Sequence, residues 1–504
     1  MFTLLTRNET FPMSKHAIVI GAGLAGLASA CLLARRGYNV TVIEKNSTPG
    51  GKMQEFHKDS YRFDTGPSLF TMPFILKRLF EECGEQFDDH LELTEPEPLC
   101  RYFFPDGTIF NNYAERDRSM AEIEKFAPED REAYARFLDY SEGLYDKIAE
   151  AFLFNTLFSL KDLKHVKWSD FLKIDAFSTV SDKVDDYFQS DYLRKFFKRF
   201  TTYNGSSPFQ APATLNVIPH VELNMGGYYV KGGMYRIAES LYDLGKSLGV
   251  RYQFEAAVKE ITVSAKKATG VNLINGEVIS SDLVFANSDA TDTLLNLLPE
   301  NAVSARKKRK QQALEPSCSG FVLMLGCNRS WNELAHHNIF FSEDYQAEFD
   351  QIFNQKKLPD DPTIYVANTS HTDSDHAPGN GSNLFILVNS PYLAEGQDWN
   401  VLQKTYPDQL LDKLERFGLS GLKDSVDCSK VITPENFETL YRSNKGSIYG
   451  TSSNSRFAAF VRPRNRLKSI QNLYLVGGST HPGGGIPLVI QSAFHAVDLL
   501  DRNG

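Results

Sequence analysis

The segment "HAIVIGAGLAGLASACLLARRGYNVTVIEK", residues 16–45, constrains the fold of this chain more than any other. A short buried strand leads into Gly21, Gly23 and Gly26 in GxGxxG spacing, and an apolar helix to residue 36 and a second strand follow. The first glycine permits a tight turn, the second lets a pyrophosphate approach the backbone, and the third lets helix and strand pack closely. Free N–H groups at the start of the helix favour a bound anion. The segment therefore predicts a dinucleotide-binding βαβ unit.

Glu44 and the motifs after it narrow the choice of dinucleotide. Glu44 ends the second strand, 23 residues after Gly21, where a carboxylate can accept hydrogen bonds from both ribose hydroxyls. "STPGGKM" then brings a glycine doublet and Lys52, and "FDTGPS" brings a further turn with Gly66 and Pro67. A nicotinamide dehydrogenase normally proceeds to another strand and helix at this point. Each small motif alone is an ordinary turn, but together they favour FAD, a longer cofactor that lies across the domain.

Composition and charge exclude several classes of protein. Apolar residues at 42% and charged residues at 23% are typical of globular chains, and a net charge of -9 argues against a general nucleic-acid binder. The six cysteines form no CxxC pair, which suits a reducing compartment, and no HExxH or similar ligand spacing predicts a metal site. No secretory signal is apparent, and the apolar run at 17–34 fits strand, turn and helix better than a membrane span. We therefore expect a cytoplasmic protein.

Two segments leave alternatives open. "ARKKRKQQ" at 305–312 is either a solvated helix face or a site for anionic lipid headgroups. The region from about residue 70 to 200 is predicted to be helical and is rich in phenylalanine, leucine and tyrosine. Within it, "AEAFLFNTLFSLKDLKHVKW" at 149–168 is either a core helix or a face that dips into a membrane interface.

The rest of the chain returns twice to the nucleotide-binding sheet. A helix after "GGYYVKGGM", a hairpin at Asn275-Gly276 and a strand ending in "FANSD" form the first return. Strand-like runs "GFVLMLG" and "NLFILVNSP" belong to a second excursion, and "LKSIQNLYLVGGS" with a last helix forms the second return. Both domains are therefore predicted to be discontinuous: nucleotide binding at 13–72, 222–292 and 466–504, and a substrate domain at 73–221 and 293–465.

The order of these motifs resembles a known family. "VIGAGLAGLASACLLARRGYNVTVIEK", "PGGK", "FDTGPS", "GGYYVKGGM", "FANSD" and "GGSTHPGGGIP" are similar to the bacterial phytoene-desaturase type of carotenoid desaturases over essentially the whole chain after Met13. "HPGGGIPLV", "LVNSPY" and "GSIYGTSSNSRFAAFVRP" most resemble the 1-hydroxycarotenoid 3,4-desaturases, with phytoene desaturase itself as the nearest competitor.

The resemblance implies an α/β, two-dinucleotide-binding (Rossmann-like) FAD flavoprotein fold with a discontinuous α+β substrate domain and a helical membrane-facing part. The last strand would carry the loop 478–488 to the carboxyl ends of the sheet, where ligands of open α/β folds bind, rather than form a ligand-free hairpin. Ser479 stands where many such flavoproteins carry an acid that binds ribitol. The positions matching FAD contacts are Gly21, Gly23, Leu24 and Ala25 at the pyrophosphate, Glu44 and Lys45 at the ribose, Gly51, Lys52, Gly66 and Pro67 in the following turns, Val258 at adenine, and Gly478, Gly485, Ile486 and Pro487 at the flavin.

The implied reaction removes two hydrogens from neighbouring carbons of a carotenoid, with FAD as the hydride acceptor. His481 is the single candidate for a polar catalytic residue, with a loop-stabilising role as its alternative. Exposing a chain of about forty carbons to water costs tens of kcal/mol, at ~0.8 kcal/mol per CH₂. The carotenoid should therefore be collected from a lipid bilayer, with the enzyme bound peripherally to the inner membrane. The resemblance names no electron acceptor and no oligomeric state.

Other functions share the same motifs. A carotenoid isomerase or ketolase would keep both FAD and the polyene. An amine oxidase would use FAD on a polar amine and often carries a cysteine near the last loop, whereas no cysteine follows Cys428 here. A prenyl-protein carrier of this fold would bind without catalysis.

Overall fold

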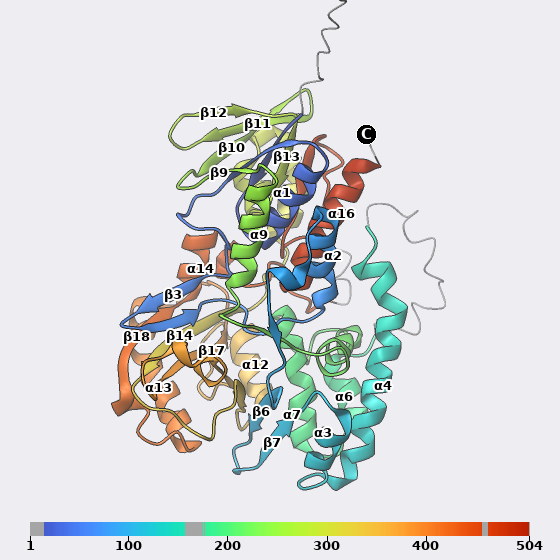
Figure 1. The fold of residues 1–504 in the computed structure, drawn as a ribbon. Coiled ribbons are helices and arrows are strands. Elements are labelled where there is room, and N and C mark those ends of the chain that lie inside the picture. Colours follow the sequence, from blue (N-terminus) through green and yellow to red (C-terminus); the bar gives the residue numbers. More distant parts are fainter. Residues whose placement is uncertain (1–14, 157–174, 176, 456–461, 503–504) are drawn as a thin grey trace, which may run out of the picture.

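The computed structural model describes residues 15–156, 175, 177–455 and 462–502. These residues form two lobes, with the nucleotide-binding sheet in the upper one and a larger sheet flanked by helices in the lower one (Figure 1). Among the described residues, no helix is both long and apolar enough to span a bilayer.

A parallel sheet of five strands organises the upper lobe. α1 (Leu24–Arg35) connects the central strands, as the GxGxxG segment predicts, and packs between α9 (Arg236–Ser247) and α16 (Ile486–Asp501). The strand order is β19 (Leu473–Leu475), β13 (Leu283–Ala286), β1 (His16–Ile20), β2 (Asn39–Ile43) and β9 (Arg251–Gln253). Neighbouring strands of this sheet thus come from distant parts of the chain, because β1 pairs with β13 and β13 with β19.

A small antiparallel sheet covers the other face of the parallel sheet, since Ile18 of β1 and Val271 belong to one buried cluster. Its strands are β10 (Val258–Ser264), β11 (Lys267–Leu273) and β12 (Val278–Ser280). The hairpin predicted at Asn275-Gly276 is confirmed: β11 and β12 pair antiparallel, and Gly276 has φ +93°, which favours glycine.

A sheet of seven strands forms the centre of the lower lobe. The runs "GFVLMLG" and "NLFILVNSP" are its two long strands, and they pair along their whole length. The order is β18 (Val426–Ile432), β14 (Ser319–Cys327), β17 (Ser382–Ser390), β16 (Ile364–Asn368), β15 (His337–Phe340), β6 (Cys100–Phe103) and β7 (Ile109–Asn112). The expectation of a helical region throughout 70–200 is wrong at β6 and β7, where Asp106-Gly107 turns the chain back into a hairpin.

Helices cover this sheet on both sides. α13 (Trp399–Arg416) packs on one face, and the helices α3 (Arg116–Ile123), α4 (Arg131–Ile148), α6 (Val180–Tyr187) and α7 (Asp191–Lys198) gather near its other end (Figure 1). Seven phenylalanines of the aromatic-rich region are buried in the core between these helices and the sheet: Phe104, Phe110, Phe137, Phe188, Phe196, Phe197 and Phe200. Residues 157–168 of the segment predicted to be either a core helix or a face at a membrane interface lie outside the described residues.

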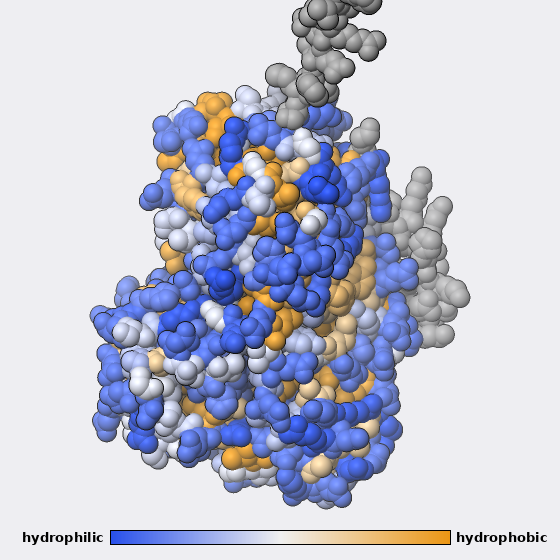
Figure 2. All heavy atoms as spheres, in the orientation of Figure 1, coloured by the Kyte–Doolittle hydropathy of each residue, from blue (hydrophilic) through white to orange (hydrophobic). Residues whose placement is uncertain are grey.

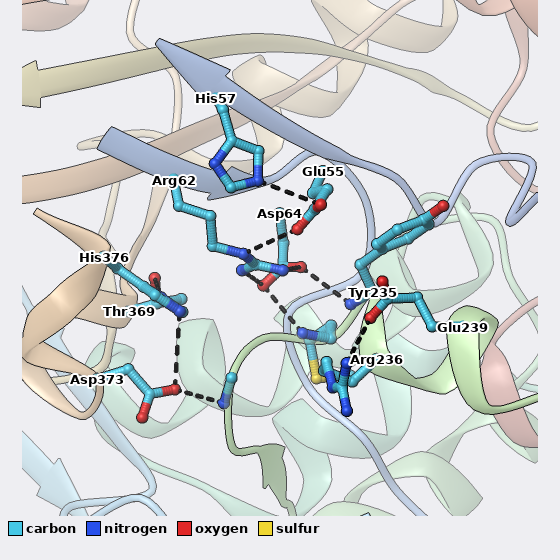
Figure 3. Close-up of polar contacts among 12 residues, drawn as sticks. Glu55, His57, Arg62, Asp64, Tyr235, Arg236, Glu239, Thr369, Asp373 and His376 are labelled. Atoms are coloured by element: carbon cyan, nitrogen blue, oxygen red, sulfur yellow. Dashed lines mark hydrogen bonds and ion pairs between the residues drawn. The ribbon is translucent and has the colours of Figure 1, made fainter. Parts of the chain in front are cut away.

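A buried polar joint connects the lobes (Figure 3). Arg62 and Asp64 lie on β4 (Tyr61–Asp64), which packs against β17 of the lower sheet. Asp64 accepts hydrogen bonds from both terminal nitrogens of Arg62, each 2.8 Å, and from the backbone N–H groups of Met234 and Tyr235 at the start of α9. This pair explains one glycine of "GGYYVKGGM", because a Cβ on Gly233 would lie 2.1 Å from the Arg62 guanidinium.

Candidate flavin and substrate site

One cavity of about 710 Å³ lies where the two lobes meet. Its volume is in the upper range of sites for small molecules and cofactors. All the residues predicted to bind FAD, together with His481, line it: Gly21, Gly23, Leu24, Ala25, Glu44, Lys45, Gly51, Lys52, Gly66, Pro67, Val258, Gly478, His481, Gly485, Ile486 and Pro487. Segments from three separate parts of the chain thus converge on one space.

The start of α1 forms an anion-binding cradle at one end of this cavity. The first N–H groups of a helix have no intrahelical partner, and the N-cap residue Gly23 has no side chain to accept them. The Asn287 side chain, in the amide orientation that satisfies both of its ends, accepts the N–H groups of Gly23 and Gly26 at 3.2 Å, so a bound anion would face those of Leu24 and Ala25. The loop and the helix approach so closely that no side chain fits at Gly26, because a Cβ there would lie 2.0 Å from the Gly21 carbonyl oxygen. Asn287, directly after β13, lies against this loop, and a Cβ on Gly23 would lie 2.8 Å from its side-chain amide. The motif "FANSD" contains Asn287 but did not predict a role for its side chain.

Glu44 is fixed at the carboxyl end of β2. Its Oε2 accepts the N–H of Ala22 at 2.7 Å and its Oε1 accepts the N–H of Asn46 at 2.8 Å, so the buried carboxylate also holds the glycine loop in place. Each carboxylate oxygen keeps a lone pair for a further donor. Ribose hydroxyls are donors of this kind.

Two cations lie further along the cavity, the partly buried Lys52 and the buried Arg462. Lys52 donates to the carbonyls of Ile448 at 2.7 Å and Ser447 at 3.3 Å, and burial lowers its pKa to about 8. Arg462 donates to the Gly478 carbonyl at 2.7 Å, and burial lowers its pKa to about 10. Asp289, which accepts the N–H of Thr291 at 2.8 Å, is the acidic group that interacts with both cations. Asp289 ends the "FANSD" motif and Arg462 lies in "GSIYGTSSNSRFAAFVRP", but neither motif predicts a role for these two side chains.

The loop 478–488 forms the next wall. A Cβ on Gly484 would lie 2.6 Å from the ring of Tyr449, so only glycine fits there without displacement. α16 begins directly after Gly485, and no side chain of that residue caps it. Gly485, Ile486 and Pro487 line the cavity, so the partly positive N-terminal end of α16 faces it. Ser479 accepts the N–H of Ala290 at 2.8 Å, so its hydroxyl supports the "FANSD" turn.

His481 makes structural contacts on the cavity wall. Its Nε2 lies 3.1 Å from the carbonyl oxygen of Asn155, so this nitrogen carries the proton. The ring stacks on His495, whose Nε2 lies 2.9 Å from the Leu153 carbonyl oxygen. Burial lowers the pKa of His481 to about 4, which makes the ring neutral and a weak base at neutral pH. The predicted catalytic role of His481 stays a prediction, and these contacts favour its loop-stabilising alternative.

The remainder of the cavity extends over the lower sheet. Its wall there is mostly apolar, with Leu99, Ile339, Phe385 and Leu387 among the residues that line it. A buried ion pair between Arg199 and Glu222 interrupts this apolar surface.

The residues present fit FAD. The N-terminal end of α1 and the cation Lys52 suit the pyrophosphate, Glu44 suits a ribose, and the glycines of the last loop leave room for a flat ring. Among the described residues, no cluster of three or more histidine, cysteine, aspartate or glutamate side chains is arranged to hold a metal ion.

Comparison with known proteins agrees with this geometry. Residues 24–500 match the model of the flavin-containing amine oxidoreductases. The chain is 38% identical to a 1-hydroxycarotenoid 3,4-desaturase of Flavobacterium sp. (strain P99-3), covering 96% of this chain and 99% of that protein. It is 36% identical to a 4,4'-diapolycopene oxygenase of Methylomonas sp. (95% and 96%) and 34% identical to a 4,4'-diaponeurosporene oxygenase of Staphylococcus aureus, strain MSSA476 (97% and 98%).

Solved structures show the same fold. A putrescine oxidase variant superposes with a TM-score of 0.66 at 12% identity, covering 97% of this chain and 99% of that one. An oxidoreductase of Methanosarcina mazei gives 0.66 at 15% identity, covering 96% and 100%. The predicted α/β flavoprotein fold is confirmed. The protein is an FAD-dependent oxidoreductase, and it belongs to the carotenoid desaturase and oxygenase family of the flavin-containing amine oxidoreductases.

Proposed function

We propose that this protein desaturates a carotenoid in carotenoid biosynthesis, and that its substrate is a 1-hydroxycarotenoid such as 1'-hydroxy-γ-carotene, oxidised at the 3,4 bond. One observation carries the proposal: the cavity that begins at the dinucleotide cradle continues over a mostly apolar wall of the lower sheet. A long hydrocarbon fits such a wall, whereas a small polar amine gains little from it. The likeness to a 1-hydroxycarotenoid 3,4-desaturase supports the choice of substrate.

In this proposal the protein mainly binds and orients, since bound FAD supplies the hydride acceptor. The cradle at Gly21–Ala25 and Lys52 hold the pyrophosphate, Glu44 and Lys45 the ribose, and Val258 the adenine. Gly478 and the start of α16 hold the flavin end, and Gly51, Gly66 and Pro67 form the wall beside it. Arg462 and the N-terminal end of α16 place positive charge there, which favours a reduced, negatively charged ring.

The substrate must enter from a lipid phase, and we place that entrance beside α2 (Pro73–Cys83). Met72, directly before α2, and Phe152 and Leu153 line the cavity. Next to them Phe74 is 44% exposed and its ring lies 6.1 Å from that of Phe154. Figure 2 shows apolar atoms gathered on the surface in the middle of this face, beside α2. This surface is the proposed peripheral contact with a bilayer, and the proposed site of the enzyme is the inner face of the inner membrane.

The proposal is tested with purified protein, reconstituted with FAD on liposomes, and four separate substrates: 1'-hydroxy-γ-carotene, γ-carotene, phytoene and putrescine. We expect loss of two hydrogen atoms and a red-shifted spectrum with the hydroxylated carotenoid. Preferential turnover of phytoene would instead identify the protein as a phytoene desaturase. Release of peroxide with putrescine would identify it as an amine oxidase. A product of unchanged mass would assign an isomerase, and carotenoid binding without bound flavin a carrier.

The two oxygenase relatives favour a second candidate function. They share 36% and 34% identity with this chain over nearly its whole length. If the protein acts as an oxygenase or ketolase, the product gains oxygen from ¹⁸O₂. Mass spectrometry of products formed under ¹⁸O₂ separates this reaction from desaturation, which adds no oxygen atom.

A further inference from the structure

A buried ion pair of Arg199 and Glu222 lies in the mostly apolar part of the cavity wall. Arg199 begins η4 (Arg199–Asn204), directly after α7, and Glu222 lies in η6 (His220–Asn224). The Arg199 Nη2 to Glu222 Oε1 distance is 2.6 Å, and the two side chains are only 6% and 3% exposed. Buried ion pairs are often replaceable by apolar side chains without loss of stability. Such a pair in the wall of a cavity for a hydrocarbon therefore calls for a functional reason.

Neutral polar groups surround the pair. The hydroxyl of Tyr203 donates to Glu222 Oε2 at 2.5 Å, and Arg199 Nη2 also donates to the hydroxyl of Tyr102. His337 and Tyr365 line the same cavity, and His337 Nδ1 lies 2.7 Å from the Tyr365 hydroxyl. Arg199, Tyr203, Glu222, His337 and Tyr365 all line the cavity, and we call these five residues the polar end.

The polar end has unused hydrogen-bonding capacity. Among the described residues, Arg199 Nε and His337 Nε2 are buried without a hydrogen-bond partner. Each oxygen of Glu222 accepts one bond from a neighbour and has room for another. Buried polar groups are normally satisfied, so unused donors and acceptors together point to a ligand that supplies both.

The charge of the polar end selects the class of ligand. Arg199 and Glu222 neutralise each other, and His337 is neutral because burial lowers its pKa to about 3. An ammonium group would need an unpaired carboxylate, and a carboxylate would need an unpaired cation. A neutral hydroxyl both donates and accepts, as the free positions on Glu222, Arg199 and His337 require.

We propose that the polar end binds the oxygen-bearing end group of the carotenoid and thereby sets the substrate preference. This inference rests on the proposed function and deepens it: the hydroxyl donates to Glu222 and accepts from Arg199 or His337. A carotenoid with a hydrocarbon end would leave these groups unpaired in an apolar space, and it would be rejected for that reason.

The test compares binding of γ-carotene with that of 1'-hydroxy-γ-carotene, which differ in the oxygenated end. Liposome-bound holoenzyme is titrated with each, and Kd is read from the carotenoid absorbance shift, with turnover measured separately. The wild type should bind the hydroxylated carotenoid more tightly. Glu222→Gln and Arg199→Met should each weaken it by about 10- to 100-fold while changing the Kd for γ-carotene less than about threefold.

Matched controls come from neighbouring residues that do not line the cavity. His336→Gln changes a buried histidine adjacent to His337, and Lys198→Met changes a cation adjacent to Arg199 that pairs with Asp185. Both controls should keep the wild-type ratio of the Kd for γ-carotene to the Kd for 1'-hydroxy-γ-carotene. His337→Gln should lower this ratio. If Glu222→Gln or Arg199→Met loses FAD or unfolds, Tyr203→Phe removes one hydroxyl only and should still lower the ratio.

The outcomes separate this inference from the proposed function. A wild type that desaturates 1'-hydroxy-γ-carotene, with variants of unchanged binding ratio, overturns the role of the polar end and leaves the function standing. A wild type that binds the hydroxylated carotenoid more tightly without desaturating it, with the preference lost in Glu222→Gln, supports the polar end and overturns the proposed reaction. Equal binding of both carotenoids by the wild type overturns the inference.

Discussion

Arg62 and Asp64 lie two residues apart on the same face of β4, with both terminal nitrogens of the guanidinium bonded to the carboxylate at 2.8 Å. The same carboxylate accepts two N–H groups at the start of α9, and Asn383 of the lower sheet donates to the Arg62 carbonyl at 2.5 Å. One ion pair thus holds the edge of the flavin lobe to the sheet that forms the substrate wall.

Replacing Asp64 should destabilise the protein strongly. Asp64→Asn breaks the buried pair and leaves the Arg62 guanidinium with Glu55, 3.1 Å from its Nε, as its remaining carboxylate, which should lower the free energy of unfolding by up to about 3–5 kcal/mol. Denaturant unfolding of the holoenzyme measures this loss. Arg236 and Glu239 provide the control, because their side chains are 51% and 38% exposed. Glu239→Gln should lower the free energy of unfolding by less than about 1 kcal/mol. Equal losses for the two variants would contradict the assignment of the joint to Arg62 and Asp64.

Glu44 should control the affinity for FAD. Glu44→Ala removes the ribose acceptor and leaves the Ala22 N–H without its partner, so the Kd for FAD should rise by about 10- to 100-fold. Fluorescence titration of the apoprotein with FAD gives this value. Glu277→Ala, at an exposed position of the small sheet, should keep the wild-type Kd.

Gly26 should tolerate no side chain. The Cβ of Gly26→Ala would lie 2.0 Å from a backbone oxygen of the glycine loop, so the variant should lose most of its bound flavin and unfold at a lower temperature. Gly143 is also helical, in α4, but no heavy atom lies within 4 Å of its Cβ position. Gly143→Ala should therefore keep its flavin and be slightly more stable, by up to about 1 kcal/mol. A flavin content unchanged in Gly26→Ala would contradict the close packing at the cradle.

The stacked pair of His481 and His495 should make stability depend on pH. Burial lowers their pKa values to about 4 and about 3, while the unfolded chain takes up protons below about 6.5. Their contribution is therefore complete above pH 7 and is lost as pH falls from 6.5 toward 4, by about 2 kcal/mol per ring at pH 5.

His495→Gln keeps an N–H donor for the Leu153 carbonyl and removes one titrating ring. The decrease in the free energy of unfolding between pH 7.5 and pH 5 should then be smaller by about 2 kcal/mol than in the wild type. An unchanged pH dependence would show that the His495 ring is not held neutral.

The local parts of the fold could be predicted because their signals lie within about thirty residues. The GxGxxG unit and the Asn275-Gly276 hairpin each follow from turn chemistry beside a clear hydrophobic pattern. The hairpin of β6 and β7 carried a similar Asp-Gly signal, which the surrounding aromatic residues obscured. The strand order of the seven-stranded sheet could not be predicted, because β6 pairs with β15 across more than 200 residues of chain and no local pattern specifies that partner.

The same distinction applies to the site. Residues with backbone roles, such as Gly23 or Gly485, could be placed from their motifs, because conformation and close approach select glycine. Arg199, Glu222 and Arg462 carry no turn or spacing signal of their own along the chain. Their importance arises only from burial beside the cavity, which depends on packing between distant elements.

The separation of β13 and β19 has a consequence for synthesis on the ribosome. The cradle at Gly21 emerges early, but β19, which completes the parallel sheet beside β13, ends at Leu475 and precedes the loop of the flavin end. At about 5–20 residues per second, the early βαβ unit waits tens of seconds for its partners. Its apolar faces are exposed to chaperones or misassociation during that time. We expect FAD to be captured only after the last helix has left the exit tunnel.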